Sequence, residues 1–79
     1  MLNPKQKELI DDYIKAIEER FPECKFVDIC ESPSTPNEIW INFTEPEDED
    51  RGLELIEFVG NRTTDILLDY GYQILPMTI

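Results

Sequence analysis

Two short apolar runs separated by a turn-forming segment constrain the fold of this chain more than any other feature. Residues 24–31 and 38–44 carry β-branched and aromatic residues in near alternation, and the segment between them, ESPSTPN, is rich in Pro, Ser and Thr. β-Branched and aromatic residues favour strands, whereas Pro and hydroxyl residues favour turns. The pattern therefore predicts two strands joined by a turn or short loop.

An amphipathic helix is predicted before these strands, over residues 4–20. Asn3 is suited to the N-cap position, Pro4 to the first helical position and Gln6 to the closure of a capping box. Phe21-Pro22 ends the helix, because the residue before a proline is disfavoured in the helical region. Apolar side chains three and four residues apart form one stripe, which we expect to be buried: Leu9, Ile10, Tyr13, Ile14, Ile17 and Phe21.

A longer second helix and a final strand are predicted after the two central runs. Thr44-Glu45-Pro46-Glu47 has the spacing of a capping box, and apolar rows that include Ile56 and Leu67 carry the helix to Gly71, a candidate left-handed C-terminal residue. Gly60 lowers the helix propensity, and we interpret it as permitting close packing against the sheet. Residues 72–79 are predicted to form a strand that Pro76 places at an edge or a bulge.

The expected fold class is α+β, with the element order α-β-β-α-β in two layers. A chain of 79 residues has room for one small domain, here residues 1–79. We expect a three-stranded sheet with both helices on one face, which leaves the opposite face to solvent or to a partner. Alternation along the second strand assigns Glu38, Trp40 and Asn42 to that open face, and Ile39, Ile41 and Phe43 to the core.

Charge limits the partners that this chain can have. Seven Lys and Arg against eighteen Asp and Glu give a net charge of −11. Such a chain repels phosphate backbones, so we expect no direct contact with nucleic acid, and any charged partner should be basic. An acidic patch is predicted at the start of the second helix, where the helix dipole favours negative charge: Glu45, Glu47, Asp48, Glu49 and Asp50.

The sequence offers little for catalysis, metals or cofactors. There is no His, no Gly-rich phosphate loop is present, and Ser32 and Ser34 lack an evident base. The acidic run does not match a calcium-binding loop, because Arg51 and Phe58 fall where that loop needs oxygen ligands. We therefore expect no enzyme activity, no metal site and no cofactor.

The two cysteines and the apolar pattern bear on the compartment. Cys24 and Cys30 are six residues apart on what reads as one strand, so their Cα atoms are expected to lie roughly 20 Å apart, too far for a disulfide. Reduced thiols fit the cytoplasm. The first ten residues do not resemble a signal peptide, and no apolar run reaches the length that a membrane span requires.

Ser32 follows the first predicted strand and Glu38 opens the second. In this layout the chain resembles the minimal nucleotidyltransferase fold of small antitoxin-type proteins. That family has Gly-Ser after the first strand and Asp-x-Asp at the start of the second, where divalent metals hold a nucleoside triphosphate. Here Glu31 cannot give the close backbone approach of Gly, and Trp40 cannot ligate a hard cation. The third family acid would fall within residues 73–77, where there is none. The resemblance implies a degenerate relative without the catalytic motif.

The leading hypothesis is a non-catalytic cytoplasmic domain that binds a protein partner, as a homodimer or as an accessory subunit. Its candidate surface is the open sheet face, with Trp40, Phe26, Cys30, Glu38 and Asn42. A simpler interpretation is that Trp40 only packs against Phe26 or Cys30 on the neighbouring strand.

Two alternative functions remain open. The acidic patch is compatible with an antitoxin-like or nucleic-acid-mimicking neutraliser of a basic protein. The family resemblance is compatible with residual binding of nucleotide or magnesium at the degenerate site.

Overall fold

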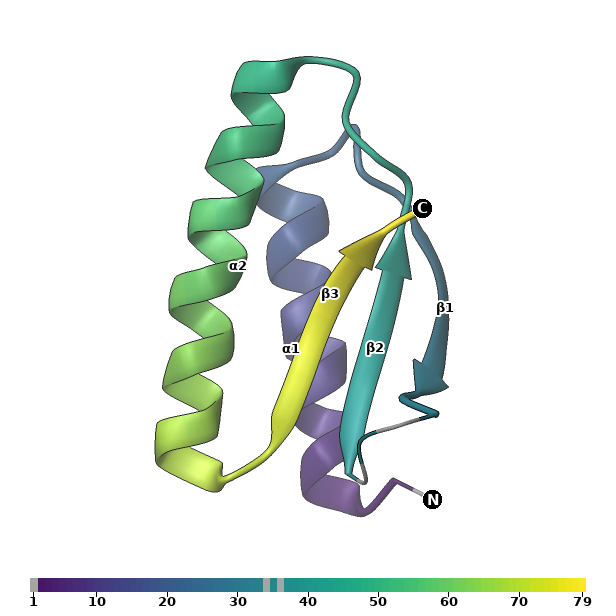
Figure 1. The fold of residues 1–79 in the computed structure, drawn as a ribbon, viewed down its shortest axis with the longest axis vertical. Helices are drawn as coiled ribbons and strands as arrows, with labels where there is room; N and C mark the ends of the chain where they lie inside the picture. The colour runs from purple at the N-terminus through teal and green to yellow at the C-terminus, as the bar shows by residue number, and fades with distance from the viewer. Residues whose placement is uncertain (1, 34, 36) are drawn as a thin grey trace.

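The computed structural model describes residues 2–33, 35 and 37–79, which form five elements (Figure 1). The order is α1 (Pro4–Arg20), β1 (Phe26–Glu31), β2 (Glu38–Phe43), α2 (Glu49–Tyr70) and β3 (Gln73–Thr78). One sheet has the order β1-β2-β3, in which β2 pairs antiparallel with β1 and parallel with β3. The predicted α+β class and its element order are confirmed.

The ends of α1 agree with the sequence, whereas α2 begins later than predicted. The Asn3 side chain accepts a hydrogen bond from the Gln6 N–H at 2.8 Å, and the Gln6 side chain accepts from the Asn3 N–H at 3.0 Å. The Thr44 hydroxyl does not cap α2, because it accepts from the Lys25 N–H at 2.8 Å. Asp48 is the N-cap residue instead. At the other end Gly71 has φ of 77°, the left-handed conformation expected there.

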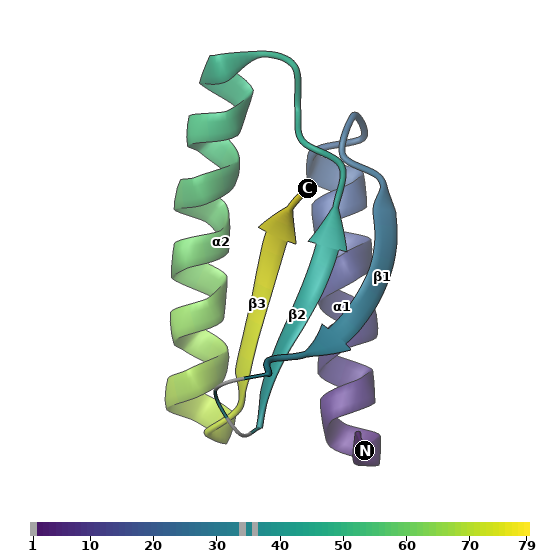
Figure 2. The same cartoon turned by 45° about the vertical axis from the view of Figure 1, so that its right-hand side comes forward.

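Both helices pack on one side of the sheet. In Figure 1, α1 lies behind β2 and β3, and α2 runs beside β3; Figure 2 shows the same arrangement after rotation. The apolar side chains of both helices and of the sheet form one buried cluster. Its members from the regular elements are Ile10, Tyr13, Ile17, Ile39, Ile41, Phe43, Leu55, Ile66 and Ile74.

A short polar chain crosses this core and connects three elements. The hydroxyl of Tyr13, a fully buried residue of α1, lies 3.0 Å from the Val59 carbonyl oxygen and 2.8 Å from Thr63 Oγ1 on α2. The Thr63 hydroxyl donates to the Ile74 carbonyl of β3 at 3.0 Å. Burial raises the pKa of Tyr13 above its ordinary value, because the phenolate would lose its hydration.

The free edge of β3 offers an interrupted row of groups for pairing with another strand. The Ile79 N–H donates to the Phe43 carbonyl of β2. Because backbone groups alternate in direction along a strand, those of Ile74, Pro76 and Thr78 point away from β2. Thr63 already occupies the Ile74 carbonyl, and proline has no N–H. The expectation that Pro76 marks an edge is confirmed.

Candidate interaction surface

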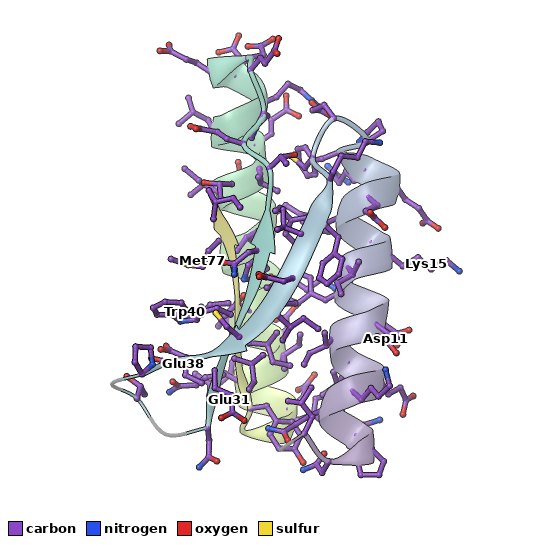
Figure 3. The ribbon with its side chains drawn as sticks, turned by 90° about the vertical axis from the view of Figure 1, so that its right-hand side faces the viewer. Asp11, Lys15, Glu31, Glu38, Trp40 and Met77 are labelled. Atoms are coloured by element: carbon purple, nitrogen blue, oxygen red, sulfur yellow. The ribbon has the colours of Figure 1, made fainter. Side chains whose placement is uncertain are left out.

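The open sheet face carries most of the predicted site residues. Trp40 of β2 pairs with Cys30 of β1 and with Leu75 of β3, so these three side chains form a row across the sheet. Figure 3 shows Trp40, Glu38 and Met77 projecting from the side of the sheet opposite α1. Among the described residues no helix covers this face. The predicted orientation of Glu38, Trp40 and Asn42 is therefore confirmed.

The polar groups on this face are mostly paired with one another. The Trp40 indole N–H donates to Glu38 Oε2 at 3.2 Å, and the Asn42 amide donates to Asp28 Oδ1 at 2.6 Å. The Asn42 amide also lies 3.6 Å from Cys30 Sγ. These bonds hold the indole and the amide in place, while Trp40 stays half-exposed. The face thus presents a fixed aromatic ring among polar groups that bond one another.

Phe26 does not belong to this face, so its predicted place beside Trp40 is wrong. A β-bulge between Phe26 and Asp28 shifts the register, and Phe26 pairs with Phe43. The two rings lie 6.1 Å apart in an edge-to-face arrangement, and Phe43 is buried in the core. One extra residue in a strand moves the residues beyond it to the other face. Phe26 therefore covers the edge of the core. In its place, Leu75 and Met77 of β3 complete the open face.

The acidic patch lies in the loop before α2 and in its first turn. Glu45, Glu47, Asp48, Glu49 and Asp50 are all exposed. Asp48 Oδ1 accepts from the Asp50 N–H at 2.9 Å, which caps the helix. All five carboxylates give this end of the molecule its negative charge.

Arg51 is the nearest cation in the sequence to this patch, and other groups engage it. Its guanidinium donates to both carboxylate oxygens of Glu23 at 2.7 and 3.2 Å, to Glu54 at 3.0 Å and to the Arg20 carbonyl at 2.8 Å. It also lies 4.6 Å from the centre of the Phe21 ring. The hydrogen bonds from Arg51 lower the pKa of Glu23. Arg51 therefore ties α2 to the end of α1.

An apolar groove that the sequence did not predict lies between α2 and β3. Its volume is about 400 Å³. Its floor consists of the buried side chains of Ile17 and Phe43. We call it the α2–β3 groove; α2 contributes Leu55, Ile56, Val59 and Gly60 to its walls, and β3 contributes Pro76, Met77 and Thr78. Because Met77 also lies on the open face, the two apolar regions are continuous.

Gly60 keeps this groove open. No described atom outside its own helical turn lies within 4 Å of the place where a Cβ would stand, so the prediction that Gly60 allows close packing against the sheet is wrong. A glycine inside a helix costs up to about 1 kcal/mol relative to alanine. No contact among the described residues requires a glycine at this position of the helix.

Ile56 and Leu67, which the sequence places in the apolar rows of α2, are exposed in the structure, Ile56 by 69%. They share one side of α2 with Leu53 and Gly60, a stripe that carries no charged residue from Leu53 to Leu67. That uncharged stripe is the signal from which the groove could have been predicted.

The residues behind the nucleotidyltransferase resemblance lie close together, at the turn between β1 and β2. The Ser32 N–H donates to the Glu38 carbonyl at 2.9 Å, and Ser32 Oγ accepts from the Thr35 N–H at 3.2 Å. The Glu38 carboxylate is bonded to the indole of Trp40. Across residues 2–33, 35 and 37–79, no three Cys, Asp or Glu side chains gather as metal ligands. Ser34 lies outside the described residues.

Comparisons with known proteins found no matching family model, curated protein or solved structure. Within the described part of the chain, neither helix has the length and apolar character needed to cross a membrane.

Proposed function

We propose that this protein is a non-catalytic domain that acts by binding another protein through its open sheet face, with Trp40 at the centre. The observation that carries the proposal is the position of Trp40. It stands half-exposed on a sheet face that no described helix covers, between Cys30 and Leu75 and close to Met77. Exposed aromatic side chains held in one orientation are frequent anchors of protein interfaces.

The polar groups near Trp40 support binding rather than turnover. Glu38 is bonded to the indole and Asp28 to Asn42, so the two nearest carboxylates serve to fix other side chains. Acid or base catalysis needs a group within hydrogen-bond reach of a substrate and with a suitable pKa. The proposed compartment is the cytoplasm, which is supported by the free thiols of Cys24 and Cys30.

The test compares two variants that introduce the same charge at different surfaces. Trp40→Glu places a carboxylate at the centre of the open face, and Leu68→Glu places one on α2 at a side chain that is 77% exposed. Each protein is immobilised and exposed to extract of the native cell. We expect at least one protein to be retained by the original chain and by Leu68→Glu, and lost with Trp40→Glu.

Sedimentation of the same three proteins tests whether the partner is a second copy. Retention that is equal for all three folded proteins, together with unchanged sedimentation, contradicts the assignment of the open face.

A second candidate function, neutralisation of a basic protein, is favoured by the state of Arg51. Because its donors are directed to Glu23, Glu54 and Arg20, the acidic patch keeps its charge for a partner. Binding through this patch should weaken steeply as salt rises above about 0.15 M, where the Debye length is about 8 Å. Titration calorimetry against a basic protein at two salt concentrations measures this, and binding that is insensitive to salt excludes it.

A further inference from the structure

The α2–β3 groove is lined mainly by apolar side chains of the two elements that border it. The buried side chains of Ile17 and Phe43 form its floor, while Ile56 and Gly60 stand on one wall and Met77 on the other. Apolar side chains exposed in a concave site favour the binding of an apolar surface. An occupant that covers Ile56 removes a side chain from water that is now mostly exposed.

The β3 edge disfavours an extended strand as that occupant. Strand addition depends on backbone hydrogen bonds along the edge. At this edge the Ile74 carbonyl is bonded to Thr63, and Pro76 has no N–H. A strand added here would meet an interrupted row of hydrogen-bonding groups, so side chains have to supply more of the recognition.

A helix satisfies its backbone hydrogen bonds internally, so it needs only an apolar face to bind in such a groove. Gly60 suits a helix in particular, because a glycine on a helix surface allows a second backbone to come close.

The charge around the groove determines which sign of charge the bound helix should carry. On α2, Glu49, Leu53, Ile56 and Gly60 follow one another at spacings of four, three and four residues, so they lie on one side of the helix. Glu49 stands about 10 Å from Ile56 along the axis, given a rise of about 1.5 Å per residue. Glu45 and Glu47 are exposed in the loop just before α2. Acidic side chains thus stand just beyond one end of the groove. A second copy of this chain carries the same charge of −11 and is disfavoured as the occupant.

We propose that the α2–β3 groove binds a basic amphipathic helix of a partner protein. This inference rests on the proposed function of protein binding. The apolar side of that helix lies over Gly60 and Ile56. Its Lys and Arg side chains lie near Glu49 and the preceding acidic loop.

The test uses three labelled peptides of about 18 residues, long enough for about five helical turns. The first has Leu at spacings of three and four with Lys elsewhere. The second has the same composition in an order that destroys the apolar stripe, and the third replaces each Lys by Glu. Fluorescence anisotropy gives the affinities. We expect the first peptide to bind at least about tenfold more tightly than either control. Equal affinity for the first two peptides overturns the proposal, because charge alone then explains binding.

Two leucine variants locate the binding site. Gly60→Leu fills the groove and replaces a poor helix former, so we expect a fold at least as stable and an affinity at least about tenfold lower. The matched control is Asn61→Leu, which adds the same side chain on an adjacent, exposed position of α2 outside the groove. It should change the affinity by less than about twofold. Amide chemical shifts of the original protein provide a reading independent of either variant, with the largest changes expected at Ile56, Gly60 and Met77.

Peptide binding by the Trp40→Glu variant distinguishes a failure of this inference from a failure of the proposed function. A loss of peptide binding with Trp40→Glu that exceeds the loss with Gly60→Leu moves the helix to the open face. That result overturns the groove as its site and leaves protein binding through Trp40 in place. Shift changes confined to residues outside the groove also overturn the proposal. The proposed function itself fails separately, when Trp40→Glu retains every captured protein.

Discussion

Removal of one buried hydroxyl, by Tyr13→Phe, tests whether the polar chain across the core holds the helices to the sheet. The Thr63 hydroxyl donates its single proton to Ile74, so the Tyr13 hydroxyl must donate toward both Val59 and Thr63. It has one proton to share between them. The variant therefore loses about one hydrogen bond, which contributes about 0.5–1.5 kcal/mol. The Val59 carbonyl keeps its helical partner, so we expect a loss of about 1 kcal/mol, or a fall in Tm of about 4–8 °C for a domain of this size.

Circular dichroism during thermal and urea unfolding measures this loss. The matched control is Tyr70→Phe, which removes a hydroxyl from a tyrosine that is 46% exposed and should change the free energy of unfolding by less than about 0.5 kcal/mol. Equal stability of the original chain and Tyr13→Phe refutes the reasoning, because the polar chain would then contribute nothing. A loss in the free energy of unfolding that is much larger for Tyr70→Phe than for Tyr13→Phe also refutes the reasoning.

Alkaline pH gives a second reading of the same hydroxyl. Burial raises the pKa of Tyr13 in the folded state above the unfolded value of about 10. Below about pH 10 both states are protonated, and the stabilising contribution of the phenol is complete. As the pH rises toward the folded pKa, the unfolded state loses its proton first, so stability falls. The stability difference between the original chain and Tyr13→Phe should therefore narrow from about pH 8 to about pH 11. A constant difference contradicts the raised pKa.

Two further predictions concern Arg51 and the thiols. Arg51→Lys replaces a planar fork that donates to three groups by a single ammonium, so Tm should fall. The fall should be smaller once the pH drops below 4.5, the usual pKa of Glu23, because the lowered pKa of Glu23 stabilises the fold only while it is ionised; a pH-independent fall contradicts this pairing. Cys30 is exposed, whereas burial raises the pKa of the Cys24 thiol. Ellman's reagent should thus modify Cys30 at least about tenfold faster than Cys24. Cys30→Ser should remove the fast phase, and its persistence rejects the assignment.

Local patterns in the sequence were sufficient to predict the elements and the orientation of β2. Asn3 and Gly71 act through bonds within a few residues, and the alternation about Trp40 needs only the pleat of a strand. Thr44 shows where such rules fail. Its hydroxyl could accept a hydrogen bond either from the start of α2 or from another part of the chain. In the structure it accepts from the Lys25 N–H and does not cap α2.

The remaining parts of the candidate site depend on tertiary structure. The bulge that turns Phe26 toward the core changes the register by one residue, and composition does not reveal such a shift. The groove forms where α2 and β3 lie side by side, with Gly60 of α2 in its lining. From the sequence, Gly60 is interpreted as permitting close packing against the sheet, whereas in the structure it borders the open groove.

The interrupted outer edge of β3 limits how copies of this chain can pair sheet to sheet along their edges. Open-ended growth of a fibril requires each molecule to have two sheet edges that can pair, one with the preceding molecule and one with the next. Here Pro76 and the Ile74 carbonyl held by Thr63 make one of those edges a poor partner for a neighbour. Pairing through β1 is therefore favoured over pairing through β3, and pairing through β1 alone ends when two copies have joined. Continuous growth of a sheet from copies of this domain is thereby disfavoured.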